Sequence, residues 1–434
     1  MSEYFEIAYA AVSKRLCFFT GTGFSKAISA NTAPSWQGLL ETICDKCDNP
    51  GALKAALFPI GKINPLSLEE AAQVLAIELQ TNDLGIHDEI AALIEAVKLG
   101  GDNTSIEEFC SLQSFRVITT NYDKLMEKLI GENDCLSITP GLPIPRSTAR
   151  VKVYHVHGSV DSPVNMVVTS DDYFKFINGE SYFSRKLSTV LHENTIVILG
   201  YSLGDTNLKA ILSDYKNFSR NHVIGGNIFL VSRSAVDKTV KDYYAHCYGI
   251  RVLDGVDVHT FFKDLNSSLP IAQKCINYSV KNIQKIVSGK HFFSEEYLRV
   301  ENSFFEIVVG ISALGLSIDS KEVVLLLDEV IKAKITLTGA DGAWDQYEHL
   351  AKWLIYLATI LELKGTSIEK TFLRAAKKSM ESMRSEKYVG YSWHAFNSWN
   401  FKWDGIIAAN RSLIRKYITE QSNWADALLI VNRN

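Results

Sequence analysis

The 434-residue sequence lacks the features that would place it in a membrane or on nucleic acid. No apolar run reaches the roughly 20 residues that a transmembrane helix needs. The first ten residues have no basic segment followed by an apolar one, as a secretion signal would. The formal net charge of −4 leaves no basic excess for a phosphate backbone. We therefore expect a soluble cytoplasmic protein with no membrane partner and no direct nucleic-acid binding.

The seven cysteines do not form a recognisable framework, because their number is odd and they are scattered along the chain. Cys44 and Cys47 form a lone CxxC motif, and no second CxxC or HxxxH motif follows to complete the four ligands of a structural zinc site. Free thiols suit a reducing cytoplasm. We expect no disulfide framework and no metal.

Proline is missing from the whole later part of the chain. None of the nine prolines follows Pro270, whereas six of the seven tryptophans do. This shift predicts a boundary between an α/β domain over residues 1–268 and a helical C-terminal domain over 269–434. Apolar residues three or four positions apart from Trp344 to Leu361 predict a helix in the later domain. We expect that domain to serve oligomerisation or partner docking.

The earlier part alternates short apolar runs with helical patterns. Nearly continuous apolar runs predict a parallel sheet covered on both faces. The predicted strands are Leu16–Phe19, Arg116–Thr119, Val151–Val156, Asn165–Val168, Thr195–Leu199 and Asn227–Val231. Residues 37–110 are too many for a simple crossover and predict a helical insertion, clearest at Leu68–Leu79 and Ile86–Leu99. The predicted fold class is α/β, with a Rossmann-like parallel sheet and a helical subdomain, followed by an all-α C-terminal domain.

A glycine-rich turn follows the first predicted strand. Its sequence is Thr20-Gly21-Thr22-Gly23-Phe24-Ser25, and two glycines there let the backbone approach a pyrophosphate. Lys26 stands at the third glycine position of the dinucleotide fingerprint, so the fingerprint is incomplete. A plain strand-to-helix turn would use the same glycines.

Two polar turns follow the next strands. In Thr119-Thr120-Asn121-Tyr122-Asp123, helix capping explains one or two polar residues but not four at the sheet edge where ligands bind. In the turn from Tyr154 to Ser159, strand alternation would place His155 and His157 on one face. His157 is well placed as a general base, although a structural histidine is the alternative for either residue, and a metal site lacks a third ligand.

Two later turns have small and hydroxyl-bearing residues. Gly200-Tyr201-Ser202-Leu203-Gly204-Asp205 and Ser232-Arg233-Ser234 each follow a predicted strand. Such residues could line the adenosine half of a dinucleotide, although ordinary turn chemistry explains each turn singly. Five such turns in one domain together predict a ligand-binding edge.

In this order the motifs TGTGFS, TTNYD, VHGS, VVTSDDY and ILGYSLGD resemble the bacterial SIR2-like family, distant relatives of the sirtuins, over about residues 10–260. The resemblance implies NAD+ as substrate. It gives catalytic roles to Asn121 beside the nicotinamide ribose, to Asp123 of the same motif and to His157 as the catalytic histidine. The residues it implies for binding NAD+ are Gly21, Thr22, Gly23, Ser25, Thr120, Gly200, Ser202 and Ser232.

The sequence departs from the sirtuin pattern in three places. Thr22 replaces the usual alanine of the GAGxS loop, and Ala33-Pro34-Ser35-Trp36 stands where sirtuins have GIPxFR, without the arginine. The four-cysteine zinc ribbon of the deacylating sirtuins is missing. The last two departures weaken acyl-peptide chemistry and favour water as the acceptor.

SIR2-like proteins without the ribbon are typically NAD hydrolases of bacterial anti-phage systems. The resemblance therefore implies cleavage of the nicotinamide–ribose bond to give nicotinamide and ADP-ribose, in a gated effector that depletes NAD. The architecture also resembles the SIR2 component paired with a HerA-type ATPase, so we expect a homo-oligomer and consider such an ATPase as its partner. An NAD-dependent deacylase or ADP-ribosyltransferase and a non-catalytic NAD or ADP-ribose sensor stay open as alternatives.

Overall fold

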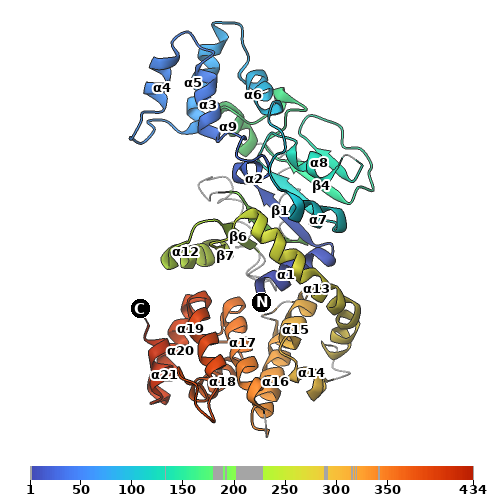
Figure 1. The fold of residues 1–434 in the computed structure, drawn as a ribbon, viewed down its shortest axis with the longest axis vertical. Helices are drawn as coiled ribbons and strands as arrows, with labels where there is room; N and C mark the ends of the chain where they lie inside the picture. Colours follow the sequence, from blue (N-terminus) through green and yellow to red (C-terminus); the bar gives the residue numbers. More distant parts are fainter. Residues whose placement is uncertain are drawn as a thin grey trace.

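A parallel sheet lies between two groups of helices, a small one above it and a larger one below it (Figure 1). The computed structural model describes residues 2–131, 133–178, 189–190, 193–201, 228–287, 292–313, 316, 318, 320–340 and 343–433. Within the described residues, no helix is long and apolar enough to cross a membrane.

Seven strands in the described part of the chain form one sheet, and every neighbouring pair is parallel. Their order across the sheet is β3-β4-β2-β1-β5-β6-β7. The chain passes from β1 to β2 on one side and returns to β5 on the other, so β1 lies at a topological switch point, where open α/β sheets bind ligands. The strands are β1 (Leu16–Thr20), β2 (Arg116–Thr119), β3 (Cys135–Ile138), β4 (Val151–His155), β5 (Thr195–Leu199), β6 (Ile228–Ser232) and β7 (Ile250–Asp254).

Both faces of the sheet are buried, as continuous apolar strands require. Along β1, Leu16 and Phe18 belong to one core cluster, while Cys17 and Phe19 belong to a second cluster on the other face. The first face packs against α1 (Ser2–Val12), α7 (Thr104–Leu112) and α13 (Val258–Val287), whose Phe262 ring lies 5.3 Å from the Phe18 ring between centroids. Further helices described between strands are α2 (Thr22–Ile28), α8 (Leu125–Ile130), α9 (Ser170–Asn178) and α12 (Lys238–Tyr248).

The helical insertion between β1 and β2 has a core of its own. Leu40, Ile43, Leu75 and Ile90 are fully buried in it. Tyr122, which follows β2, belongs to the same cluster, so the insertion is anchored beside the carboxyl edge of the sheet. Its helices are α3 (Trp36–Cys44), α4 (Pro50–Leu57), α5 (Leu68–Gln80) and α6 (Ile86–Glu95).

The long helix α13 leads from the sheet to the C-terminal helices and contains Pro270 within it. It packs along α1 and continues against α15, and Figure 1 shows it crossing beside the sheet before the chain enters the lower group. Trp353, Trp399 and Trp403 fill that group's core. The C-terminal helices are α14 (Glu295–Arg299), α15 (Ser303–Ala313), α16 (Lys321–Leu337), α17 (Trp344–Ile360), α18 (Glu369–Glu381), α19 (Trp393–Lys402), α20 (Ala408–Gln421) and α21 (Ala425–Val431).

Charged pairs connect these C-terminal helices to the sheet region. Arg411 of α20 donates to Asp242 of α12 at 2.5 Å. Lys238 of α12 also pairs with Asp404, which precedes α20, at 3.0 Å. Because α13 is continuous through residue 268, the predicted division between residues 268 and 269 stays a prediction.

The predicted fold class is confirmed, and five of the six predicted strands correspond to strands of the sheet. The predicted strand Asn165–Val168 is wrong. It begins at the end of a short 3-10 helix (Pro163–Asn165), and its Val167 N–H donates to the His157 carbonyl at 2.8 Å without joining the sheet. Strands β3 and β7 were not predicted, and both lie at the sheet's edges.

Candidate active site

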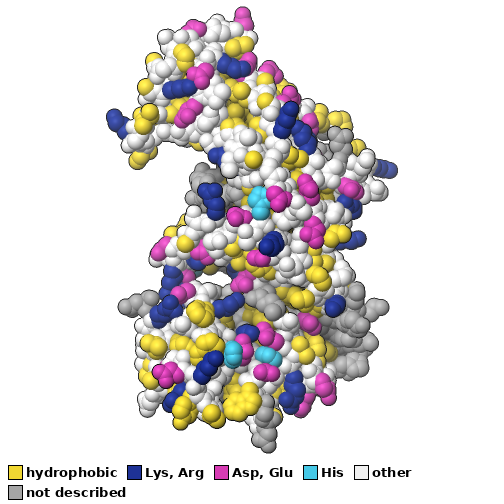
Figure 2. Space-filling model, viewed as in Figure 1, with side chains coloured by type: hydrophobic (Ala, Val, Ile, Leu, Met, Phe, Trp, Pro, Cys, Tyr) yellow, Lys and Arg dark blue, Asp and Glu magenta, His cyan; other side chains and the backbone are white. Residues whose placement is uncertain are grey.

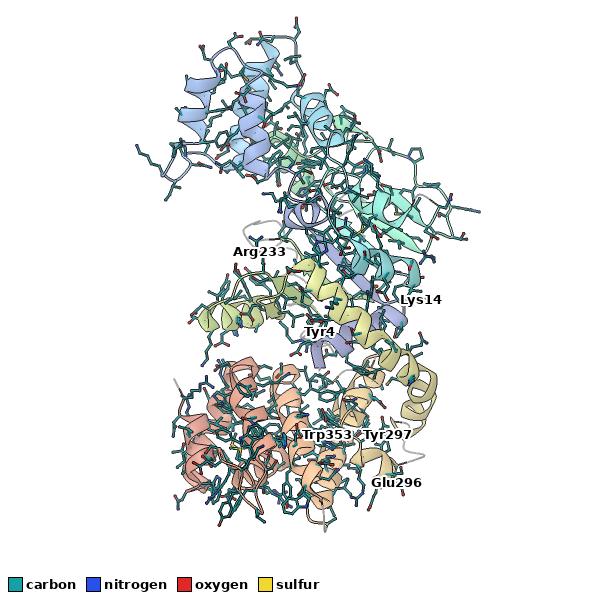
Figure 3. The ribbon with its side chains drawn as sticks, in the orientation of Figure 1. Tyr4, Lys14, Arg233, Glu296, Tyr297 and Trp353 are labelled. Carbon is teal, nitrogen blue, oxygen red and sulfur yellow. The ribbon has the colours of Figure 1, made fainter. Side chains whose placement is uncertain are left out.

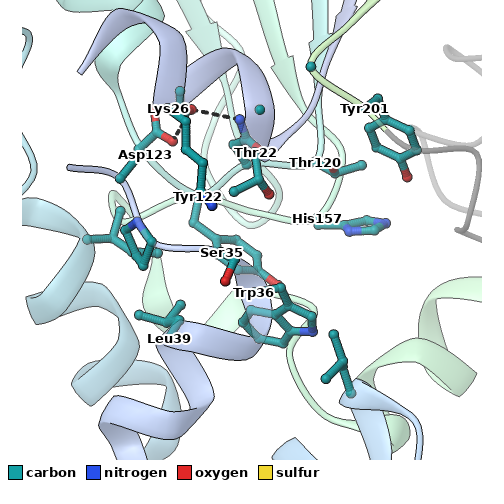
Figure 4. A pocket seen from close by; sticks show the side chains of 18 of the residues that line it. Thr22, Lys26, Ser35, Trp36, Leu39, Thr120, Tyr122, Asp123, His157 and Tyr201 are labelled. Carbon is teal, nitrogen blue, oxygen red and sulfur yellow. Dashed lines mark hydrogen bonds between the residues drawn. The ribbon is translucent and has the colours of Figure 1, made fainter. Parts of the chain in front are cut away.

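A pocket of about 720 Å³ lies where the carboxyl ends of β1, β2, β4 and β5 meet the helical insertion (Figure 4). Figure 2 shows the surface hollowed below the insertion. The volume falls within the roughly 300–1,000 Å³ typical of small-molecule sites. Eight of the predicted site residues line it, namely Thr22, Gly23, Ser25, Thr120, Asn121, Asp123, His157 and Gly200.

Glycines allow the turn after β1 to touch the end of β5. The Gly23 N–H donates to the Gly200 carbonyl at 2.7 Å. A Cβ on Gly23 would lie 2.7 Å from that carbonyl oxygen, and one on Gly200, whose φ is +61°, would lie 1.9 Å from the Phe24 nitrogen. Gly21 does not line the pocket itself, but a Cβ there would lie 2.3 Å from the Tyr201 ring. This contact between two backbones is the reason that the motif needs its glycines.

Ser25 joins the first motif to the second. Its hydroxyl donates to Asp123 Oδ2 at 2.7 Å and accepts from Asn121 Nδ2 at 2.8 Å. The other carboxylate oxygen of Asp123 accepts from the Leu125 N–H at 3.0 Å. Burial raises the pKa of Asp123, and the hydrogen bonds from Ser25 and Leu125 partly oppose that shift. The Asn121 amide is therefore held in a fixed orientation at the pocket wall.

His155 is a structural residue. It is fully buried, with Nδ1 3.0 Å from the Asn121 carbonyl and Nε2 2.7 Å from Glu127 Oε1. Both partners only accept, so the ring satisfies them when both nitrogens carry a proton. Burial alone would raise the pKa of Glu127, but His155 and Lys124 lower it to about 2. The pair of His155 and Glu127 therefore fixes the position of the Asn121 carbonyl.

His157 belongs to the pocket, in the turn after β4 has ended. Because β4 ends at His155, the strand alternation on which the predicted shared face of His155 and His157 rested does not extend to His157. The segment at 165–167 folds back on the turn, since a Cβ on Gly158 would lie 2.7 Å from the Asn165 carbonyl oxygen. The His157 ring meets Tyr173 edge-on at 5.4 Å between centroids, and Figure 4 shows it projecting between Tyr201 and Trp36.

Besides Gly21, one described residue predicted to bind NAD+, Ser232, does not line the pocket. Ser202 lies outside the described residues. Ser232 ends β6, and its hydroxyl donates to the Ser234 carbonyl at 2.7 Å. The roles of all the predicted site residues remain predictions.

Sequence reasoning missed several residues of the pocket wall. Lys26 lines it, and its side-chain amine makes no ion pair or hydrogen bond with another described residue. Trp36 also lines it, because Ser35 caps α3 by accepting from the Gly38 N–H at 3.1 Å and so starts the helix there. The signal for Lys26 was its position directly after Ser25. The signal for Trp36 was its position after a capping serine.

Within the described residues, no group of three or more His, Cys, Asp or Glu side chains could hold a metal ion. Cys44 and Cys47 are buried in the core of the insertion as free thiols. They contribute to packing at that position.

Residues 116–253 match the family described as the SIR2-like domain. The matched segment runs from β2 to β7 and includes Asn121, Asp123 and His157, while the glycine-rich turn precedes it. The match confirms the resemblance to SIR2-like proteins on which the site prediction rests.

The chain is also similar to curated bacterial proteins. It is 34% identical over 112 residues to the NAD(+) hydrolase ThsA of Bacillus cereus (strain MSX-D12), which is 24% of this chain and 24% of that protein. It is 36% identical over 104 residues to the ThsA of Enterococcus faecium, covering 23% and 22% of the two chains. It is 23% identical over 157 residues to the defense-associated sirtuin 2 of Bacillus subtilis, covering 35% of this chain and 16% of that one. The chain thus spans a quarter or less of these relatives' length.

Proposed function

We propose that this protein hydrolyses NAD+ at the nicotinamide–ribose bond and releases nicotinamide and ADP-ribose. The observation that carries the proposal is the convergence of Asn121 and His157 on one pocket with the glycine turn of β1. The similarity to proteins named NAD(+) hydrolase supports the same reaction.

The topology suggests how the dinucleotide lies. The pyrophosphate belongs at β1, over the Gly23 turn and the start of α2, where the glycines allow close approach and the helix dipole favours an anion. Lys26 adds a positive charge on the pocket wall. The nicotinamide ribose then extends toward Asn121 and His157 after β2 and β4, and the adenosine extends the other way, toward β5 and β6.

The reaction needs an oriented ribose, stabilisation of developing positive charge and a nucleophilic water. Nicotinamide leaves as a neutral molecule, taking the electron pair of the broken bond, so no acid is required for departure. The ribose becomes oxocarbenium-like, as in glycoside hydrolysis. In our proposal the Asn121 amide positions the water and the ribose hydroxyls, and His157 accepts the proton of the water as its oxygen bonds to the ribose carbon. Asp123 holds Ser25 and thereby the amide.

An NAD+ hydrolase without restraint would be toxic to its own cell, so we propose that the activity is gated in anti-phage defence in the bacterial cytoplasm. The C-terminal helices would provide the gate, through assembly of a homo-oligomer or docking of a HerA-type ATPase. The ion pair between Arg411 and Asp242 gives such an event a physical connection to the sheet region.

The test is to incubate the purified chain with NAD+, alone and with its candidate partner, and to identify the products by mass spectrometry. Equimolar nicotinamide and ADP-ribose are expected. Acyl-ADP-ribose from an acylated peptide, or ADP-ribose attached to protein, would instead indicate a protein-modifying enzyme. Stoichiometric binding with no nicotinamide release under either condition would contradict the proposal and indicate a sensor.

A further inference from the structure

An exposed arginine, Arg233, follows β6 at the ligand-binding edge of the sheet. Arg233 is exposed and makes no hydrogen bond or ion pair with any described residue. Figure 3 shows it beside the end of β6, on the side of the hollow below the insertion. Strand β6 pairs with β5, whose last residues lead into Gly200 and Tyr201 of the pocket. Arg233 is therefore one strand beyond the pocket wall already described.

The position matches the adenosine ribose of a dinucleotide. Neighbouring strands lie about 4.8 Å apart, so β6 is two such steps, about 10 Å, from the pyrophosphate site at β1. Asn121 and His157, on the other side of β1, are assigned to the nicotinamide half of the dinucleotide. A dinucleotide laid across the switch point thus brings its adenosine ribose to the turn after β6.

The chemistry of this turn favours an anion. A site selective for the free 2′-hydroxyl of NAD+ places a carboxylate there, whereas a nearby arginine accommodates the 2′-phosphate of NADP+. Two carboxylates near this turn are occupied. Asp237, four positions after Arg233, accepts from the Thr239 N–H at 2.8 Å, and Asp254, which lies opposite Ser232 in the sheet, pairs with Lys241 at 2.8 Å.

The shape of the turn leaves the guanidinium available. The Ser232 hydroxyl donates to the Ser234 carbonyl at 2.7 Å and so closes a tight turn around the intervening residue. A guanidinium presents a planar fork that pairs with a phosphate through two hydrogen bonds. We infer that Arg233 binds the 2′-phosphate of NADP+ and that the site accepts NADP+ as well as NAD+. This inference rests on the proposed function.

The experiment measures nicotinamide release from NAD+ and from NADP+ by the full chain, under whatever condition activates it. The wild type is expected to cleave both. Arg233→Ala should lower kcat/KM for NADP+ by about 10- to 100-fold through KM, the usual range for losing a charge-assisted hydrogen bond, and should change NAD+ cleavage by less than about threefold. Arg374→Ala, which removes an exposed arginine from α18, is the matched control and should change neither substrate.

Two outcomes would overturn the inference: a wild type that cleaves NAD+ but not NADP+, or an Arg233→Ala variant that loses both substrates equally. Calorimetry of the equilibrium binding of both nucleotides distinguishes a failure of this inference from a failure of the proposed function. A chain that cleaves neither nucleotide yet binds NADP+ more tightly than Arg233→Ala does would uphold the inference and contradict the hydrolase. A chain that binds neither nucleotide would contradict both.

Discussion

The hydroxyl of Ser25 donates a 2.7 Å hydrogen bond to the carboxylate of Asp123, although 98 positions separate the two residues in the sequence. The same hydroxyl accepts from the Asn121 amide. A glycine-loop residue therefore orients the residue that we propose to hold the reacting water. This link makes the phosphate side and the nicotinamide side of the pocket one unit.

Replacing Ser25 with alanine tests that link. The Asn121 amide would lose its acceptor, and a small displacement of a positioning group costs up to about 100-fold in rate. We expect kcat for nicotinamide release to fall by about tenfold or more, with little change in thermal stability. The acid limb of the pH–rate profile should move to higher pH, because the hydroxyl now lowers the pKa of Asp123. An unchanged kcat would show that Ser25 does not position Asn121.

Replacing Asp123 with asparagine should lower the activity without lowering the free energy of unfolding at pH 7. Burial raises the pKa of Asp123 above its ordinary value of 3.8, so between that value and the raised pKa the folded state binds more protons than the unfolded state. Stability conferred by the wild-type residue therefore falls as pH rises through that window. At pH 7 the neutral asparagine should leave the unfolding free energy equal to that of the wild type, or higher by about 1 kcal/mol, while activity drops. Urea denaturation at pH 7 and pH 3 measures the difference, which should shrink at pH 3.

Gly23→Ala should separate the two loops that the glycines bring together. The new Cβ would lie 2.7 Å from a backbone oxygen, which has no room to move aside cheaply. We expect KM for NAD+ to rise by about tenfold or more as the phosphate site opens. Gly51→Ala is the control, because nothing lies within 4 Å of a Cβ there and alanine stabilises a helix by about 0.5–1 kcal/mol over glycine. Equal kinetic effects of the two changes would contradict the assignment of the loop.

Lys334 gives the C-terminal helices a measurable pH dependence. It is fully buried, and its amine donates to the Leu298 carbonyl at 2.8 Å and to Gln346 Oε1 at 2.7 Å. Burial, with nearby Arg299, lowers its pKa to about 7. From pH 7 to about 10 the unfolded lysine keeps a proton that the folded one has lost, so stability rises with pH across this window.

The variant Lys334→Met isolates this effect. It leaves two buried acceptors unpaired, which should cost about 1–3 kcal/mol at pH 7. Chemical denaturation should show the gap between wild type and variant widening from pH 7 to pH 9. A gap that stays constant over that range would mean that the buried lysine keeps an ordinary pKa.

Much of the architecture could be predicted because its signals are local. The continuous apolar runs of β1, β2 and β5 require burial on both faces, and the sheet provides it. Asn165–Val168 has a similar apolar run but lies outside the sheet. Val168 packs into the insertion's core, and the Val167 N–H donates to the His157 carbonyl, so these apolar residues belong to a buried loop. A short apolar run does not reveal which of these partners it has.

The candidate site was predicted as a set of turns, but its inner contacts were not. Turn chemistry identified Asn121 and His157, because each follows a strand at the same edge of the sheet. That His155 is structural and His157 lines the pocket depends on where β4 ends and on the hydrogen bond from His155 to Glu127 of α8. The spacing of the two histidines in the sequence specifies neither. Trp36 reaches the pocket because it starts α3 of the insertion, whose core is anchored beside the sheet edge.

The central claim is that Asn121 and His157 cleave NAD+ in this pocket. The most direct measurement is nicotinamide release, quantified by chromatography, from the wild type, Asn121→Ala, His157→Ala and the control His394→Ala, an exposed histidine of α19. We predict a loss of at least about 100-fold for the first two variants with their folds intact by circular dichroism, and wild-type activity for the control. Turnover near the wild-type rate by both Asn121→Ala and His157→Ala would contradict it.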